Sequence, residues 1–314
     1  MSAHHTIEAS VSIVLCTYNG EAYIAEQIQS LLAQTYPFKD LVVVDDASTD
    51  STVAIVLRYE QIDTRIQVFT NDINLGANKS FEKALQLASA PIIAISDQDD
   101  IWHPEKIAIM MRAWTADTLL IYCDSVRFEG KLHNAPETNK KLRRIAGTDP
   151  RKISVFNTVS GHALMLKKPL LPLALPFKEG IFYDWWLAVV AMTNGGISYV
   201  PEVLVYQRTH DKNLSIHKGL TQAQQLAHHK QMVLAHLNAF KDVVNATPEQ
   251  TRYFQQLYNL WNEAQYKKFH WQLFFFLMEN RKNVYSYKKR KVGFFSYLKH
   301  SFRFARNKEV KQNL

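Results

Sequence analysis

Cysteine, glycine and proline are all scarce in this chain of 314 residues. Its two cysteines, Cys16 and Cys123, form no C-x-x-C pair, which excludes a disulfide framework and a cysteine-based zinc module. Ten glycines and ten prolines are too few for a collagen-like or linker-rich protein. No apolar run approaches the ~18 residues of a membrane-spanning helix, and residues 1–8 lack the pattern of a secretory signal. These absences favour a globular protein of the cytoplasm.

Glycine-rich phosphate loops are also missing. Neither G-x-G-x-x-G nor G-x-x-x-x-G-K occurs, so the sequence predicts no dinucleotide fingerprint and no P-loop. A phosphorylated ligand would therefore need a metal ion or basic side chains to balance its charge.

Positive charge is concentrated at one end of the chain. Residues 281–314 contain eleven Lys or Arg and one acid, whereas the other 280 residues are close to neutral. Aromatic residues alternate with these cations, which is typical of segments that lie on an anionic membrane surface. A solvated tail is the alternative. A nucleic-acid partner is not expected, because the rest of the chain carries no nucleic-acid motif.

Short apolar runs alternate with segments of helical periodicity in the first 125 residues. Strands are expected at 11–16, 41–44, 66–69, 91–95 and 119–122, and helices at 22–34, 52–59, 80–88 and 104–114. Strands that are apolar throughout predict a mostly parallel sheet with helices on both faces. Further on, we expect an exposed loop at 127–150, a strand at 197–205 and helices at 183–192, 224–240 and 248–278.

A polar cluster follows the first, second and fourth expected strands. These clusters are Thr17–Asn19, Asp45–Asp50 and Asp97–Asp100. In an open parallel sheet, ligands bind at the carboxyl ends of the strands. The three clusters therefore predict one binding site at that edge.

The cluster Asp97–Asp100 places three carboxylates within four residues. Like charges at such close range need a compensating cation, and oxygen ligands select Mg²⁺ or Mn²⁺. An acidic turn that caps the helix beginning near Pro104 is the alternative. At the second cluster, Asp45 or Asp46 is placed to accept hydrogen bonds from a nucleoside, while Ser48, Thr49 or Asp50 caps the next helix.

Five separated segments resemble glycosyltransferase family 2, in order and spacing: Val11–Gly20, Gln34–Tyr36, Val44–Asp50, Asn74–Gly76 and Ser96–Trp102. The resemblance covers about residues 11–210, and Ser96–Trp102 with Asp184–Leu187 is similar to a bacterial rhamnosyltransferase-like branch. It implies an α/β GT-A fold followed by a C-terminal helical region with the basic tail 281–314. The implied division is a nucleotide-sugar-binding half at 1–125, an acceptor-binding half at 126–217 and the helical region at 218–314.

The resemblance also implies roles for individual residues. Substrate would be bound by Thr17, Tyr18, Asn19, Asp46, Asn74, Lys79, Asp97, Trp185 and Arg208, and a divalent cation by Asp97, Asp99 and His210. The helix after Asn74–Gly76 has Phe81 where the family often has arginine, so Lys79 is the expected cation there. His162 is expected to be structural.

Asp184 matches the carboxylate of the family's acceptor-side motif, which implies the general base of an inverting transfer. From the residues alone, Asp184 also fits a helix N-cap, Trp185 and Trp186 fit core positions, and His210 fits a solvated loop.

The resemblance implies an inverting, metal-dependent hexosyltransferase of surface polysaccharide synthesis. Its donor would be a nucleotide-diphosphate sugar, with dTDP-rhamnose the first expectation, and its acceptor a saccharide or a lipid-linked saccharide. A non-catalytic nucleotide-sugar-binding or membrane-surface scaffold derived from a transferase is the alternative. The expected location is the cytoplasm, with peripheral contact to the inner face of the membrane.

Overall fold

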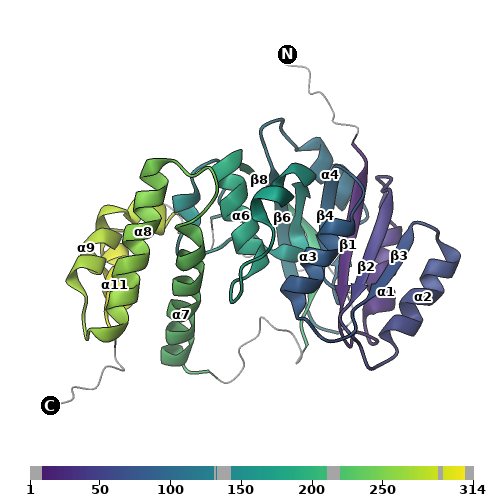
Figure 1. The fold of residues 1–314 in the computed structure, drawn as a ribbon, viewed down its shortest axis with the longest axis horizontal. Coiled ribbons are helices and arrows are strands. Elements are labelled where there is room, and N and C mark those ends of the chain that lie inside the picture. The colour runs from purple at the N-terminus through teal and green to yellow at the C-terminus, as the bar shows by residue number, and fades with distance from the viewer. Residues whose placement is uncertain (1–8, 131, 133–142, 211–219, 289–292, 308–314) are drawn as a thin grey trace. The chain divides into compact units, whose positions relative to one another are not determined.

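The computed structural model describes residues 9–130, 132, 143–210, 220–288 and 293–307 (Figure 1). By its internal contacts the chain divides into two compact units, which are each assembled from separated segments. The first unit comprises residues 1–139, 159–177 and 195–213, and the second comprises residues 140–158, 178–194 and 214–314. The nucleotide-sugar-binding half expected at 1–125 and the acceptor-binding half expected at 126–217 stay predictions, because the packing of the chain does not show which residues bind donor or acceptor.

The first unit is built on an eight-stranded sheet with the order β3-β2-β1-β4-β7-β6-β8-β5. Its strands are β1 (Val11–Thr17), β2 (Asp40–Asp45), β3 (Ile66–Thr70), β4 (Ile92–Ser96), β5 (Ile101–Trp102), β6 (Leu120–Phe128), β7 (Leu164–Lys167) and β8 (Ile197–Arg208). Strand β1 pairs in parallel with β2 and β4, β2 with β3, and β6 with β8, whereas β5 and β7 pair only antiparallel. The mostly parallel α/β sheet is thereby confirmed. The two short strands β5 and β7 were not predicted, because neither carries a long apolar run.

Helices cover both faces of this sheet. Helices α1 (Ile24–Leu32), α2 (Thr52–Ile62) and α4 (Lys106–Arg112) share one core with alternate side chains of the strands, such as Ile13 and Val43. Helix α3 (Ala77–Leu87) packs against β1 and β2 from the opposite face, and α5 (Leu171–Ala174) follows β7. Because both faces are covered, β1 and β2 need apolar side chains at nearly every position.

The second unit is helical. It contains α6 (Tyr183–Asn194), α7 (Gln222–Phe240), α8 (Pro248–Glu263), α9 (Trp271–Glu279), α10 (Arg281–Val284) and α11 (Phe294–Ala305). The single helix expected over 248–278 is wrong. A 3-10 turn at Ala264–Tyr266 ends α8, and the His270 side chain accepts a hydrogen bond from the Leu273 backbone N–H to begin α9.

The basic C-terminal segment is folded in its described part. In α11, Ser301, Phe304 and Ala305 are buried, so residues 294–305 are not the solvated tail that the sequence allowed. Residues 289–292 and 308–314, which carry five of its cations, lie outside the described residues. So do residues 1–8 and, within the loop expected at 127–150, residues 131 and 133–142. Within the described ranges, no helix is both long and apolar enough to cross a bilayer.

Candidate active site

The three predicted polar clusters meet at one edge of the sheet. Thr17 pairs in register with Asp45 at the ends of β1 and β2, and Leu15 pairs with Ser96 where β4 ends. Since these strands are parallel, the loops that follow them leave the sheet from the same side. The structure thus brings residues 17–19, 45–50 and 97–100 together, as the sequence predicts.

Side chains link these loops to one another. Thr17 Oγ1 donates to Asp45 Oδ2 at 2.7 Å, and the Asn19 carboxamide oxygen accepts from the Thr49 backbone N–H at 2.8 Å. The carboxamide of Gln98 accepts from the Tyr18 N–H at 2.9 Å and donates to the Tyr18 carbonyl at 3.0 Å. A side chain at Gly20 would meet this carboxamide, because a Cβ there would lie 2.2 Å from Gln98 Oε1. The loops are therefore held in one arrangement before any ligand binds.

Asp46 holds the turn that precedes α3. Its carboxylate accepts hydrogen bonds from the backbone N–H groups of Leu75 and Gly76, both at 2.8 Å, and from the Asn71 carboxamide at 2.9 Å. Burial alone would raise the pKa of Asp46, but these hydrogen bonds lower it below its usual value. Asn74 donates to the Asp46 carbonyl at 3.3 Å, so the structure joins two of the residues predicted to bind substrate.

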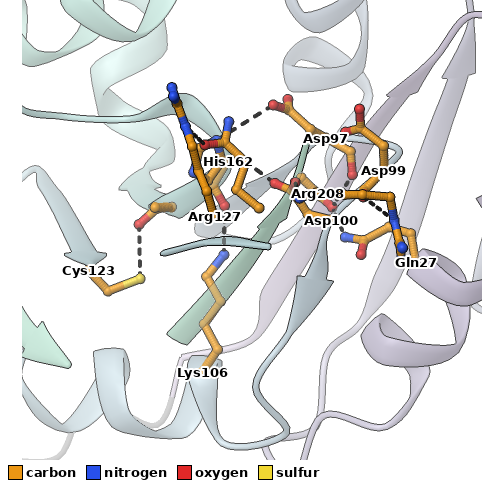
Figure 2. A network of polar contacts seen from close by, with 12 residues as sticks. Gln27, Asp97, Asp99, Asp100, Lys106, Cys123, Arg127, His162 and Arg208 are labelled. Carbon is orange, nitrogen blue, oxygen red and sulfur yellow. Dashed lines mark hydrogen bonds and ion pairs between the residues drawn. The ribbon is translucent and has the colours of Figure 1, made fainter. Parts of the chain in front are cut away.

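Asp97, Asp100 and His162 form a cluster whose ligand atoms all lie within 4.8 Å of one another (Figure 2). His162 Nδ1 lies 3.6 Å from Asp97 Oδ2 and 3.9 Å from Asp100 Oδ2. Asp100 is 2% exposed and its Oδ2 has no hydrogen-bond partner among the described residues. Burial raises the pKa of Asp100 to about 7, and Asp97 and Asp99 add to this shift. A buried carboxylate oxygen without a donor fits a cation, because a divalent ion would supply the missing partner.

Asp99 and His210 form a second contact in the same loop region. His210 Nε2 lies 2.7 Å from Asp99 Oδ2, and the imidazole stacks on the Tyr23 ring at 4.7 Å between centroids. Burial and the neighbouring Asp97 raise the pKa of Asp99, which His210 partly offsets. Two of the three predicted metal ligands are therefore adjacent, while the third, Asp97, lies with Asp100 and His162.

The Arg208 side chain is engaged by other residues of the first unit. Its guanidinium pairs with Glu26 and donates to the carbonyls of Gly130, at 2.6 Å, and Asp99, at 3.3 Å. The residue is 7% exposed, and its backbone N–H donates to Asp100 Oδ1 at 3.3 Å. These contacts show that Arg208 ties β8 to the acidic loop. Its contact with a phosphate stays a prediction.

Lys106 lies beneath the same loop and is fully buried. Its ammonium donates to the His162 carbonyl at 3.1 Å (Figure 2). It also lies 3.1 Å from the centre of the Trp102 ring. Burial lowers the pKa of Lys106 to about 7, although the nearby carboxylates of Asp100 and Asp97 favour its charged form. A buried cation at this place compensates part of the negative charge of the loop.

Tyr18 and Lys79 are open to solvent, as is Asn74. The Tyr18 side chain is 46% exposed, so its ring is accessible for stacking. Lys79 has a half-exposed side chain and pairs with Glu82 at 3.5 Å on α3. Both positions are compatible with ligand contact.

Asp184 and Trp185 belong to the second unit. Asp184 lies in the first turn of α6, where its carboxylate accepts from the Trp185 N–H at 2.6 Å. Trp185 is 2% exposed, donates from its indole N–H to the Ile153 carbonyl at 2.6 Å and stacks on His236 at 4.3 Å between ring centroids. Trp186 is 3% exposed. Both rings are core residues in this structure, which agrees with the alternative that the residues alone allowed. Stacking of Trp185 on a sugar stays a prediction.

Sequence reasoning did not assign Asp100, His162 and Lys106 to the site. Asp100 is part of the acidic cluster that begins directly after the buried strand β4, and this was a usable signal. His162 and Lys106 carry no such signal, because a histidine in a Ser-Gly-His segment and a lysine near a helix start are ordinary.

The model of the family described as Glycosyl transferase family 2 matches residues 12–171, which is just over half of the chain. The chain belongs to glycosyltransferase family 2. The match includes all three polar clusters and His162, and it ends before Asp184. Nothing in the comparisons singles out the rhamnosyltransferase-like branch.

Two curated relatives illustrate the similarity. The chain is 39% identical over 97 residues to the "putative teichuronic acid biosynthesis glycosyltransferase TuaG" of Bacillus subtilis, which is 31% of this chain and 38% of that protein. It is 30% identical over 190 residues to the "UDP-Glc:alpha-D-GlcNAc-diphosphoundecaprenol beta-1,3-glucosyltransferase WfgD" of Escherichia coli, 59% of this chain and 71% of that protein. The chain thus spans well under half of the first relative.

A solved structure shares the fold. The mannosyltransferase PcManGT of Pyrobaculum calidifontis, in complex with GDP-Man and Mn²⁺, superposes with a TM-score of 0.56 over 81% of this chain and 70% of its own. At 17% identity this likeness shows the fold alone, and it agrees with the GT-A type expected from the sequence.

Proposed function

We propose that the chain is an inverting glycosyltransferase of surface polysaccharide synthesis. It would move a sugar from a nucleotide-diphosphate donor to a saccharide or a lipid-linked saccharide. One observation carries this proposal: three polar loops meet at the carboxyl ends of parallel strands around the buried Asp97–Asp100–His162 cluster. The names of WfgD and TuaG, which refer to a diphosphoundecaprenol-linked acceptor and to teichuronic acid, support the acceptor class.

A divalent cation, Mn²⁺ or Mg²⁺, would be held at the acidic loop. Asp97, Asp99 and His210 are the ligands expected from the sequence, and the orphaned Asp100 Oδ2 adds a further donor beside His162. When bound, such an ion neutralises the diphosphate and favours its departure as a leaving group. The Mn²⁺ that accompanies GDP-Man in the PcManGT complex supports this cofactor class.

The nucleoside and the sugar would be held by this chain's own loops. The exposed Tyr18 ring is placed for stacking on a base, and Lys79 supplies a cation beside the Asn74–Gly76 turn. The backbone around Asn19 and Asp46 is fixed by the hydrogen bonds that join the loops, so little ordering is needed when the donor binds. We keep dTDP-rhamnose as the first donor to test, with UDP-glucose, the donor in the name of WfgD, as its rival.

Asp184 would take the proton from the acceptor hydroxyl. Its position in the first turn of α6 leaves one carboxylate oxygen hydrogen-bonded to the Trp185 N–H, which orients the group. The acceptor oxygen would then attack the anomeric carbon as the nucleotide diphosphate leaves from the opposite face, and the configuration would invert.

A thermal-shift panel tests the donor and the cation together. We expect a rise in the melting temperature with one nucleotide diphosphate in Mn²⁺ and no rise in EDTA, because a ligand that binds only the folded state stabilises it. Asp99→Asn should lose this shift, whereas Asp117→Asn, at an exposed position of the same unit, should retain it. No shift with UDP, dTDP or GDP under any metal condition would contradict the proposal.

Transfer by the purified protein separates the enzyme from the alternative, a non-catalytic scaffold. Asp184→Asn should retain the nucleotide-dependent thermal shift and lose transfer by at least a hundredfold, the lower range for an acid–base group. Nucleotide binding without transfer to any saccharide or lipid-linked acceptor would favour the scaffold.

A further inference from the structure

Exposed aromatic side chains gather on α9, on α11 and on the turn before α9, within the second unit. Figure 1 shows the ribbon of both helices. They include Tyr266, Trp271, Phe275, Phe295 and Phe302, with exposed fractions of 75%, 62%, 56%, 83% and 46%. Exposed cations lie on the same segments, namely Lys267, Lys268, Lys299, Arg303 and Arg306. We call these ten residues the α9–α11 surface.

The segments that carry this surface are joined along the backbone. The His270 N–H donates to the Ala305 carbonyl at 2.9 Å, and the Asn307 N–H donates to the Lys268 carbonyl at 3.0 Å. The Phe269 ring bridges them, because its centroid lies 4.6 Å from that of Trp271 and 4.9 Å from that of Phe302. Trp271 and Phe275 of α9, whose rings contact each other, and Phe302 of α11 therefore form one continuous patch.

Helix α11 has one buried side, and its exposed side carries both aromatic and basic residues. Phe295, Lys299, Phe302, Arg303 and Arg306 recur at helical spacing and all are exposed, so they form one stripe of alternating aromatic and basic side chains. The other side of the helix is anchored in the unit. Phe304 packs on Trp261 at 5.3 Å between centroids, and the hydroxyls of Ser301 and Tyr285 are hydrogen-bonded at 2.8 Å.

The charge of the patch is positive. Among the described acids of α9 and the turn before it, Glu263 contacts both Lys267, at 3.4 Å, and His270, at 3.1 Å, and Glu279 closes α9. The five exposed cations outnumber these two carboxylates. Large exposed aromatic patches mark interaction sites, and a folded surface that alternates aromatic with basic residues matches the boundary between lipid headgroups and acyl chains.

We propose that the α9–α11 surface docks on an anionic phospholipid membrane. Trp271, Phe275, Phe295 and Phe302 would enter the headgroup boundary, and the five cations would face lipid phosphates. This inference goes beyond the proposed transfer reaction and does not depend on it. Docking would hold the protein at the membrane surface, where a lipid-linked acceptor is found.

Vesicle sedimentation with the full chain tests this surface. We expect binding to vesicles that contain phosphatidylglycerol, little binding to pure phosphatidylcholine, and weaker binding at high salt. Lys299→Glu with Arg303→Glu should lower the partition coefficient by about thirtyfold or more, since each cation near the surface contributes roughly a fivefold factor. Lys39→Glu with Arg58→Glu, at exposed positions of the first unit, is the matched control and should change it little.

The aromatic residues are tested separately from the charge, because the basic segment 288–291 would itself bind anionic vesicles. Phe295→Ser with Phe302→Ser should lower binding even at low salt, whereas Ile62→Ser, which alters an 81% exposed side chain, should not. Brominated lipid should quench tryptophan fluorescence, and Trp271→Phe should remove most of this quenching. Circular dichroism of each variant shows whether it is folded.

Three outcomes would overturn the proposal. One is that the wild-type chain does not bind phosphatidylglycerol vesicles. Another is that the variant with Phe295→Ser and Phe302→Ser binds vesicles as the wild type does, which would attribute vesicle binding to charge alone. The third is that the aromatic substitutions abolish dimer formation or RNA binding instead of vesicle binding, which would assign the surface to a second copy or to a nucleic acid. Loss of transfer activity alone would concern the proposed function and not this surface.

Discussion

His236 engages both of its ring nitrogens inside the second unit. Nε2 accepts a hydrogen bond from the Phe182 N–H at 2.9 Å, and Nδ1 contacts the Met232 carbonyl at 2.8 Å, which fixes the proton on Nδ1. Phe182 precedes α6 directly, so this histidine on α7 fixes the backbone two residues before Asp184. Burial lowers the pKa of His236 to about 4, because protonation would charge a buried ring and remove its acceptor.

This pKa predicts a loss of stability in mild acid. Between pH 6.5 and 4 the unfolded chain binds a proton at His236 that the folded chain does not, so the free energy of unfolding falls as the pH falls. From pH 7 to pH 5 this single group should account for about 2 kcal/mol. Urea unfolding measures this effect. Between pH 7 and pH 5 the free energy of unfolding of His236→Gln should fall by about 2 kcal/mol less than that of the wild type.

His228 provides the matched control, because it lies on the same helix with an exposed side chain. His228→Gln should keep the wild-type pH dependence. His229 and His300, whose pKa values are also lowered to about 4 by burial, remain in both variants and leave part of the dependence in place. An unchanged pH dependence in His236→Gln would contradict the assignment.

For some residues of the candidate site the sequence predicts their position at the sheet edge, and for others it does not. Asp97 and Asp99 follow an apolar strand within three residues, so their place at the sheet edge follows from the pattern. Lys106 and His162 approach that edge from α4 and from the segment before β7, which only the completed sheet brings together. Arg208 was expected to face a phosphate, but its partners Glu26 and Gly130 are distant in sequence and leave no pattern.

At the scale of elements, local signals decide how well each boundary is predicted. Strands β1, β2 and β4 are apolar runs of four or more residues and were predicted within one or two residues. Strands β5 and β7 have two and four residues and depend on pairing with β8, β4 and β6, which the sequence does not show. The break between α8 and α9 was missed because apolar residues continue through it at helical spacing, whereas the cap that interrupts them comes from one side chain, His270.

Helix α8 begins with a complete capping box. The Thr247 hydroxyl accepts from the Gln250 N–H at 3.2 Å, the Gln250 side chain accepts from the Thr247 N–H at 2.9 Å, and Pro248 is the first helical residue. Thr247→Ala should lower the free energy of unfolding by about 1 kcal/mol, because the first turn loses its side-chain acceptor. Thr247→Ser keeps the hydroxyl and should cost only a small part of this. Equal urea midpoints for the wild type and Thr247→Ala would contradict the importance of the cap.

At the scale of the whole molecule, the second unit is assembled from three separated segments. Helix α6 is buried from Trp185 to Met192, and the partners of its first turn, His236 and Phe240, lie on α7. A fragment that ends at residue 217 would leave the side of this apolar helix that packs on α7 uncovered. We therefore expect that the two halves assigned to donor and acceptor do not form a stable protein without α7.

We expect the fragment 1–217 to be insoluble or to unfold without a cooperative transition, as followed by circular dichroism and by binding of a dye that reports exposed apolar surface. The control fragment 1–307 keeps every described element and should unfold as the full chain does. A soluble 1–217 fragment with a sharp transition would show that α6 needs no partner from α7.

The order of synthesis adds a consequence to this arrangement. Trp185 leaves the ribosome 55 residues ahead of Phe240, an interval of about three to eleven seconds at common rates of elongation. The interval between Lys152 and Ser286 is longer still, and the Ser286 hydroxyl donates a hydrogen bond to the Lys152 carbonyl in the folded unit. During that time the side of α6 that packs on α7 has no native partner, although Ile153, whose carbonyl accepts from the Trp185 indole N–H, has already been made. The nascent chain therefore presents a binding segment for a chaperone well before the unit can close.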